Sequence, residues 1–367
     1  MTTISNSSRT ENETLVAVAG APGPSAIGVI QLTGLDCRAM LQRFFSKPLP
    51  DQPGKILLGD FSDPQGNPID RVLVVQLPVA GDFFEITCHG GTRIVQRIVD
   101  TLEHAGAKLL PAEEFLPDAL KLKDPVAREA YPLLIHAKTA LAVKFLLHQS
   151  QAGLSKLMKN GSKEEFQQTA KYWPAVEYLL NGIKIVLTGP PNSGKSTLLN
   201  ALGRMDHALV ADFPGTTRDY VQTQIDLDGL PVKLLDTAGL GPTSDLLADH
   251  VQRLSLQQAK TADCVFIVLD AIEKNNSQKF IEDFQHRLST QQVIVLINKI
   301  DSPNPIWHKN DLELPASWPT LEISALKKTN LKKIPPLVWQ LLGLEGFDYR
   351  QPTAFTPHLA QCCQRNI

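Results

Sequence analysis

A glycine-rich segment that ends in lysine and serine is the part of this sequence whose residue types most directly predict chemistry. Gly189 to Ser196 read GPPNSGKS and lie between the apolar run KIVLT and the helical pattern STLLNALG. In that strand-to-helix context, glycine N–H groups can point at phosphates, Lys195 can reach the β- and γ-phosphates, and Ser196 can coordinate magnesium. The positive end of the following helix adds to the anion site. The spacing predicts a nucleoside triphosphate site, with a chance glycine-rich turn as the alternative.

Two further segments offer residues for the same phosphate and magnesium site. PGTTRD places the Thr217 hydroxyl where it can complete a magnesium shell when a γ-phosphate is present, although the segment taken alone reads as a polar turn. In KLLDTAGL an apolar strand ends at Asp236, which can hold magnesium through water, and the Gly239 N–H can meet the γ-phosphate.

The segment NKID, Asn298 to Asp301, follows the apolar run VIVLIN and predicts which base is bound. The Asp301 carboxylate can accept hydrogen bonds from N1–H and the 2-amino group of guanine, and adenine offers neither donor. Comparable polar sites reject the wrong ligand by about 10⁴ to 10⁵, so GTP is predicted rather than ATP. In EISAL the Ala325 N–H can donate to the guanine carbonyl. The predicted nucleotide-binding residues are Gly189, Asn192, Ser193, Gly194, Lys195, Ser196, Thr197, Gly215, Thr216, Thr217, Asp236, Gly239, Asn298, Lys299, Asp301, Ser324 and Ala325.

The elements that must position these residues alternate strand and helix. Each motif follows a strand, and open parallel sheets bind ligands at the carboxyl ends of their strands. The predicted fold is therefore an α/β P-loop domain with a mostly parallel sheet and helices on both faces, preceded by a small α+β domain and a reduced helical segment. The predicted boundaries are a disordered tail at 1–13, the α+β domain at 14–119, the helical segment and linker at 120–181, the P-loop domain at 182–344, and a short C-terminal segment, a truncated helical domain, at 345–367.

Three local predictions belong to the part before the P-loop domain. The pattern TRIVQRIVDTLEHAG predicts a helix that closes at Gly106. Apolar residues at helical spacing between Asp124 and Gly153 predict a single long helix. The polar stretch KNGSKEEFQQTAK predicts a linker or an exposed helix.

Composition sets the limits on partners and compartment. The formal net charge of the 367 residues is -2, so no global field would draw the chain onto nucleic acid. No apolar run approaches the roughly 20 residues that a membrane span needs, and the polar start lacks signal-peptide features, so a cytoplasmic protein without membrane contact is expected. The five cysteines show no metal-ligand spacing and are expected to be reduced thiols.

Two weaker signals each have a structural alternative. The basic run ALKKTNLKK, with Lys327, Lys328, Lys332 and Lys333, can touch RNA phosphate, but a solvated helix face is the more common explanation. His89, before Gly90 and Gly91, can line a ligand pocket, but a histidine before such a turn is more often structural.

The phosphate-loop, PGTTRD and DTAGL segments resemble the translation-factor-related GTPases, and most closely the tRNA-modification GTPase family MnmE (TrmE). The amino-terminal half supports this resemblance. TLVAVAGAPGPSAIGVIQLTG is similar to the family's opening strand region, EITCHGGTRIVQRIVDTLEHAGAKL to the end of its first domain, and LLIHAKTALAVKFLLHQSQAGLS to the first helix of its helical domain.

The resemblance implies a GTPase that couples nucleotide-dependent pairing of G domains to modification of the wobble uridine in certain tRNAs. It implies a homodimer, tRNA and a flavoprotein of the MnmG type as partners, and a folate one-carbon donor. It also implies potassium as an activating ion, with Asn192 as a ligand and backbone oxygens from Ala211 to Pro214. A cation at that position can stabilise transition-state charge as an arginine finger does; Asn192 as a simple turn residue is the alternative.

Several residues depart from the family's pattern. Position 240 is Leu, and alignment of VQRLSLQQA puts Gln252 where the family has a glutamate. Glutamine can orient water but cannot take a proton, so slow hydrolysis is expected, with Asp245 or Asp249 as substitutes. The predicted catalytic residues are Gln252, Arg218 and Thr216.

Other departures concern folate and the tRNA chemistry. Gly23-Pro24-Ser25 replaces the arginine motif PPGRG, and the SYTGED-like stretch is shortened to VAGDFF, which weakens the expectation of folate binding. The family's terminal CxGK motif is not reproduced by Cys362 and Cys363. A reduced paralogue that acts as a GTP-dependent switch or binding module, without tRNA-modifying chemistry, is therefore the alternative function.

Overall fold

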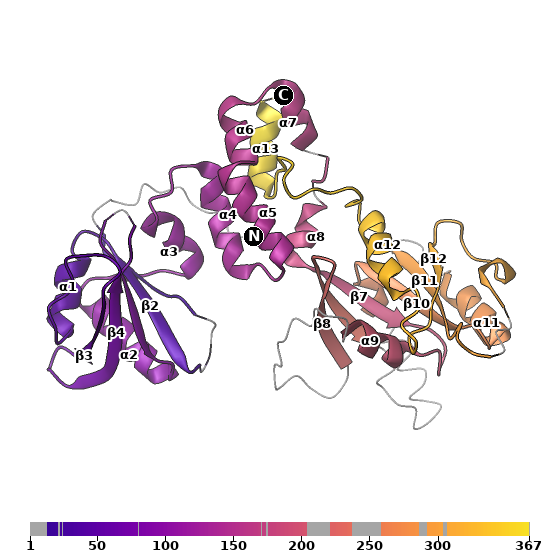
Figure 1. Cartoon of the computed structure of the whole chain (residues 1–367), viewed down its shortest axis with the longest axis horizontal. Coiled ribbons are helices and arrows are strands. Elements are labelled where there is room, and N and C mark those ends of the chain that lie inside the picture. Colours follow the sequence, from indigo (N-terminus) through magenta and orange to yellow (C-terminus); the bar gives the residue numbers. More distant parts are fainter. Residues whose placement is uncertain are drawn as a thin grey trace. The chain divides into compact units, whose positions relative to one another are not determined.

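The computed structural model describes residues 13–366 with the exception of 21–22, 24, 80, 170, 174, 204–220, 237–257, 286–291 and 304–306. The chain divides into two compact units (Figure 1): an N-terminal unit, Met1–Ile135, and a C-terminal unit, His136–Ile367. Among the described residues, no helix is both long and apolar enough to cross a lipid bilayer.

The N-terminal unit is built on a six-stranded sheet in the order β3-β4-β5-β2-β1-β6, in which only the β1–β6 pair is parallel. Its strands are β1 (Leu15–Val18), β2 (Ile27–Thr33), β3 (Ile56–Ser62), β4 (Pro68–Gln76), β5 (Phe83–His89) and β6 (Lys108–Leu109). Its helices are α1 (Cys37–Phe44), α2 (Thr92–His104), α3 (Ala112–Ala119) and α4 (Pro125–His136). The small α+β fold predicted from the sequence is confirmed.

Apolar side chains of α1 and α2 cover one face of this sheet. Leu41 and Leu102 are fully buried with Ile30 and Ile86 of the central strands. The predicted end of α2 is confirmed, because Gly106 has φ +109° and the next N–H, of Ala107, donates to Leu102 O at 2.9 Å. This left-handed turn is a common way to end a helix, and it favours glycine.

The C-terminal unit begins with short helices that pack with the end of the chain. They are α5 (Ala140–Gln151), α6 (Leu154–Asn160), α7 (Lys163–Thr169), α8 (Val176–Asn181) and α13 (Pro357–Arg365). Helix α13 packs on α7 (Figure 1). The fully buried Gln149 of α5 joins the segment before α13 through donation to Tyr349 O and Gln351 O, both at 2.9 Å.

The prediction of one long helix between Asp124 and Gly153 is wrong. The chain leaves the helix after His136 and starts α5 at Ala140. Thr139 causes the break, because its hydroxyl accepts the Ala142 N–H at 3.3 Å as an N-cap and donates to Gly229 O at 2.8 Å. Within the stretch KNGSKEEFQQTAK, Lys163–Thr169 form α7, so of the two alternatives the helix is the one observed there; it is exposed apart from the buried Phe166 and Thr169.

The P-loop domain of the C-terminal unit contains a second six-stranded sheet in the order β12-β11-β10-β7-β9-β8. Only the β8–β9 pair is antiparallel. Its strands are β7 (Ile183–Thr188), β8 (Val221–Leu227), β9 (Leu230–Asp236), β10 (Cys264–Asp270), β11 (Val293–Asn298) and β12 (Thr320–Glu322). Its helices are α9 (Lys195–Gly203), α11 (Lys274–Gln285), α12 (Ile334–Leu341) and the 3₁₀ turns η2 (Lys309–Asp311) and η3 (Leu331–Lys333).

Helices cover both faces of this sheet, as predicted. Along β10, Phe266 and Val268 face the core that contains α9 and α12, while Ile267 and Leu269 face the core that contains α11. Burial on both faces explains why the strand sequence CVFIVLD is apolar almost throughout.

Candidate nucleotide-binding site

The phosphate-loop segment connects β7 to α9, and two of its glycines admit no side chain. Gly189 has φ +146°, and a Cβ there would lie 2.0 Å from Val268 O. Gly194 has φ +93°, and a Cβ there would lie 2.2 Å from Asn298 Nδ2. Asn192 between them also has a left-handed φ of 61°. The turn therefore brings backbone close to the ends of two neighbouring strands, as a cradle of N–H groups requires.

Lys195 begins α9 and folds into this loop. Its side chain is buried, and Nζ donates to Gly189 O at 3.0 Å and Pro190 O at 2.7 Å. Burial lowers the pKa of the Lys195 ammonium, and the negative charge of Asp236 acts in the opposite direction. The predicted phosphate ligand thus lies inside the loop it is predicted to serve.

Two predicted magnesium ligands meet beside the loop. Ser196 Oγ donates to Asp236 Oδ2 at 2.6 Å, and Asp236 is buried at the carboxyl end of β9. The segments are 40 residues apart in sequence. Hydroxyl and carboxylate oxygens are ligands that magnesium prefers.

The predicted base-binding segments are tied to the phosphate loop through Asn298. Its Nδ2 donates to Ser193 O at 2.9 Å, and its Oδ1 accepts the Ala325 N–H at 2.9 Å. The Ala325 N–H was predicted to meet a guanine carbonyl and here donates to Asn298. Ser324 is buried, and its Oγ accepts the Lys327 N–H at 2.9 Å. One amide side chain thus joins three loops at one edge of the sheet.

The remaining residues of NKID differ in exposure, and Ile300 packs against the core that contains α11. Asp301 is exposed, and Lys299 has a left-handed φ of 70°. Lys299 Nζ donates to Asp270 Oδ2 at 2.6 Å. Sequence reasoning missed Asp270, although it ends the apolar run CVFIVLD as Asp236 ends another. A carboxylate at the carboxyl end of a buried strand was the signal that could have found it.

Other predicted residues are exposed or lie outside the described residues. Asn192 and Thr197 are exposed on the phosphate loop and the first turn of α9. The predicted residues Gly215, Thr216, Thr217, Arg218, Gly239 and Gln252 lie outside the described residues, as do the segment Ala211 to Pro214 and the substitutes Asp245 and Asp249.

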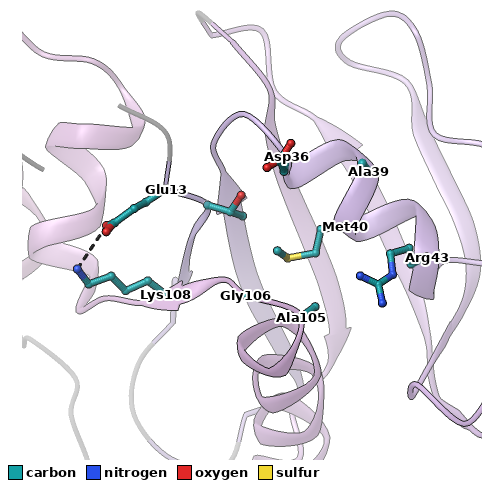
Figure 2. Close-up of a pocket in the computed structure, with 9 residues that line it drawn as sticks. Glu13, Asp36, Ala39, Met40, Arg43, Ala105, Gly106 and Lys108 are labelled. Carbon is teal, nitrogen blue, oxygen red and sulfur yellow. Dashed lines mark hydrogen bonds and ion pairs between the residues drawn. The ribbon is translucent and has the colours of Figure 1, made fainter. Parts of the chain in front are cut away.

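The N-terminal unit contains a cavity of about 540 Å³ that takes no part in this site. Figure 2 shows Glu13 and Lys108 paired at its edge, with α1 and the end of α2 around it; the ion pair measures 3.3 Å. It is lined by Glu13, Thr14, Asp36, Ala39, Met40, Arg43, Ala105, Gly106 and Lys108. Among the described residues, none that lines the cavity comes from Gly23 to Ser25 or from the VAGDFF stretch, the segments that the resemblance links to folate.

His89, the histidine before Gly90, is held by a carboxylate. Its Nδ1 lies 2.7 Å from Asp70 Oδ1, and its backbone N–H donates to Asp70 Oδ2 at 2.8 Å. Burial of Asp70 raises the pKa of its carboxyl, but these hydrogen bonds outweigh burial and leave it below its usual value. These contacts fit the structural interpretation of His89.

Comparison with known proteins extends over both units. Residues 184–299 match the family described as 50S ribosome-binding GTPase, and residues 14–120 match the one described as GTP-binding protein TrmE N-terminus. A tRNA modification GTPase MnmE from Aquifex aeolicus is 30% identical, over 90% of this chain and 82% of that relative. One from Streptococcus pneumoniae is 31% identical, over 88% of this chain and 80% of that relative. The solved G domain of the T. maritima FeoB iron transporter overlaps 43% of this chain and 98% of its own, with 25% identity and a TM-score of 0.34.

The phosphate loop after β7 and NKID after β11, joined by Asn298, make this chain a guanine-nucleotide-binding P-loop protein. The chain is similar to its relatives over most of their length, and this similarity identifies the family within that class of protein. The chain belongs to the tRNA modification GTPase MnmE family. As a GTPase of this family it binds GTP and GDP with magnesium.

Ser196 and Asp236 fit magnesium, because their oxygens converge beside the phosphate loop. These two residues would hold the ion, which would supply positive charge to neutralise the phosphates.

Proposed function

We propose that this chain takes part in modification of the wobble uridine of tRNA, as a GTP-hydrolysing switch. The observation that carries the proposal is the match of residues 14–120 to the TrmE N-terminal family. No predicted nucleotide-binding residue lies in that part of the chain, so GTP binding alone does not account for the match. Relatives that match over both units are named tRNA modification GTPases.

In this proposal the side chains divide the work of the nucleotide site. Lys195 binds the β- and γ-phosphates, and Asp301 accepts from guanine. Ser196, Thr217 and Asp236 hold magnesium, and Gly239 donates to the γ-phosphate. Gln252 orients the attacking water, with Arg218 and Thr216 beside the phosphates. Hydrolysis is slow because the Gln252 amide has no basic site for the proton of that water.

The tRNA role is tested by deleting the gene that encodes this chain and measuring tRNA nucleosides by mass spectrometry. The modified wobble uridine should disappear and return with the wild-type gene. Lys195→Ala, which removes the ammonium predicted to bind phosphate, should not restore it. Nucleosides that are unchanged by the deletion would refute the proposal.

Potassium is the proposed activating ion. Asn192 supports this, because its left-handed backbone leaves an exposed amide on the phosphate loop. Hydrolysis should be several-fold faster in potassium chloride than in sodium chloride of equal ionic strength, and Asn192→Ser should reduce that difference. Equal rates of the wild type in both salts would remove the cation mechanism.

The proposed partners are tRNA, a flavoprotein of the MnmG type and a second copy of this chain. Sedimentation of the purified chain tests the homodimer, and co-purification with the flavoprotein tests the complex. A chain that stays monomeric at all concentrations would contradict the proposed homodimer. Folate is left out of the proposal, because the arginine of the family's PPGRG motif is replaced around Gly23-Pro24-Ser25.

A switch without tRNA-modifying chemistry is the second candidate. It is favoured by Gln252 in place of the family's glutamate and by the changed folate segments. The chain bound to a non-hydrolysable GTP analogue should then capture a partner that the GDP form does not, while the tRNA nucleosides of the deletion strain stay unchanged.

A further inference from the structure

Asp270 is a buried carboxylate at the carboxyl end of β10, next to the predicted base site. Both of its side-chain oxygens accept hydrogen bonds. Oδ1 accepts the Ile272 N–H at 2.9 Å, and Oδ2 accepts from Lys299 Nζ at 2.6 Å. Its backbone oxygen accepts the Trp307 indole N–H at 3.0 Å. The residue is therefore held through both its carboxylate and its backbone oxygen.

Asp270 is also directly paired with the start of NKID. In the parallel β10–β11 ladder it lies opposite Asn298, and the next N–H, of Ala271, donates to Asn298 O at 2.9 Å. The backbone of NKID therefore leaves the sheet beside Asp270, and the Lys299 side chain reaches back to the Asp270 carboxylate.

The ion pair between Asp270 and Lys299 is partly shielded from water. The side-chain exposures are 8% for Asp270 and 35% for Lys299. Removal of one partner from such a pair leaves a poorly solvated charge, so the pair holds Lys299 more firmly than a surface pair would. Lys299 also has a φ of 70°, a region that residues other than glycine seldom occupy and that the surroundings must maintain.

We propose that Asp270 is a positioning residue for guanine selection. By holding the Lys299 ammonium, it fixes the left-handed turn at Lys299 and thereby the direction in which Asp301, two residues later, presents its carboxylate to the base. The inference rests on the proposed contact of Asp301 with guanine. The Asp270 carboxylate itself contacts the Lys299 ammonium and the Ile272 N–H, and it acts on the base site only through Lys299.

The test compares GDP with inosine diphosphate, which lacks the 2-amino group that Asp301 is proposed to bind. The ratio of the two dissociation constants measures base selection and does not depend on the fraction of folded protein. Asp270→Asn keeps the shape and removes the charge. It should lower the preference for GDP by about tenfold, because a misplaced carboxylate loses a charge-assisted hydrogen bond.

Lys299→Met removes the more exposed partner of the same ion pair and should lower the preference for GDP to a similar extent. This variant tests the proposal even if Asp270→Asn fails to fold. The double variant should resemble either single variant, because both changes remove one interaction. Asp263→Asn is the matched control. Asp263 lies just before β10 and accepts the Lys184 N–H at 2.8 Å, at the opposite end of the strand. It should leave the ratio unchanged.

A folded Asp270→Asn variant with the wild-type ratio would overturn the proposal, and so would independent effects that multiply in the double variant. If the wild type itself binds inosine diphosphate as tightly as GDP, the Asp301 assignment fails first. That failure is recognised without any variant.

Discussion

Asn298 has a structural task in addition to its predicted place in the base site. Its amide donates to Ser193 of the phosphate loop and accepts from Ala325 after β12. Gly194 lies against the same amide, so that position 194 has no room for a methyl group. At the scale of single residues, phosphate binding and base binding therefore depend on one shared side chain.

Gly194→Ala should weaken GDP binding by about tenfold or more, which corresponds to about 1.4 kcal/mol or more. The added Cβ would lie 2.2 Å from Asn298 Nδ2 and would displace the amide that holds Ser193. Isothermal titration measures the effect. Gly343→Ala is the control, because Gly343 also has a positive φ, +73°, but has no atom within 4 Å of its Cβ position. Equal loss in both variants would show that backbone strain, not the contact with Asn298, is responsible.

Sequence reasoning went furthest where the chemistry is local. The order strand, GPPNSGKS, helix fixed the positions of Lys195 and Ser196, and a strand-end carboxylate predicted Asp236 beside Ser196. It did not predict that the Ala325 N–H donates to Asn298, or that Asp270 holds Lys299. Both contacts join segments that are distant in sequence, 27 and 29 residues apart. No local pattern specifies such a pairing.

At the scale of elements, a contact between residues distant in sequence also explains why the predicted helix is broken at Thr139. Apolar spacing continues across the break, so periodicity predicts one helix. The deciding partner is Gly229, 90 residues later, in the turn between β8 and β9. The Leu141 side chain lies where a Cβ on Gly229 would be, at 2.5 Å, so the turn fits closely against the start of α5. By contrast, the alternation of strand and helix was sufficient to predict the P-loop domain.

Thr139→Ala should lower the free energy of unfolding by about 1 to 2 kcal/mol, because it removes a helix cap and a hydrogen bond between elements. Urea denaturation followed by circular dichroism measures the change. Thr139→Ser keeps the hydroxyl and should stay close to the wild type. If serine is as destabilising as alanine, the methyl group rather than the hydrogen bonds holds this junction.

At the scale of the whole molecule, the five cysteines differ sharply in their surroundings. Cys37, Cys88, Cys264 and Cys363 are buried, and none of the five forms a disulfide. Burial raises the pKa of the Cys37 thiol to about 12 and that of Cys88 to about 11, and also raises the pKa values of Cys264 and Cys363. Cys362 on α13 is half-buried, with Sγ 3.6 Å from His358 Nε2.

The native protein should therefore react quickly with one equivalent of Ellman's reagent per chain at pH 8, and with five after denaturation. The thiolate is the reacting form, and a raised pKa leaves little of it at that pH. Cys362→Ser should remove the fast phase. A fast phase of two or more equivalents would mean that a buried thiol becomes accessible in solution.

The difference in exposure between Cys362 and the four buried cysteines has a practical consequence. A maleimide dye added to the unaltered chain would attach at Cys362, on the helix that packs against α7 in the C-terminal unit. Fluorescence from that position would report on the helical segment while guanine nucleotides are titrated, and no cysteine would first have to be engineered in or out.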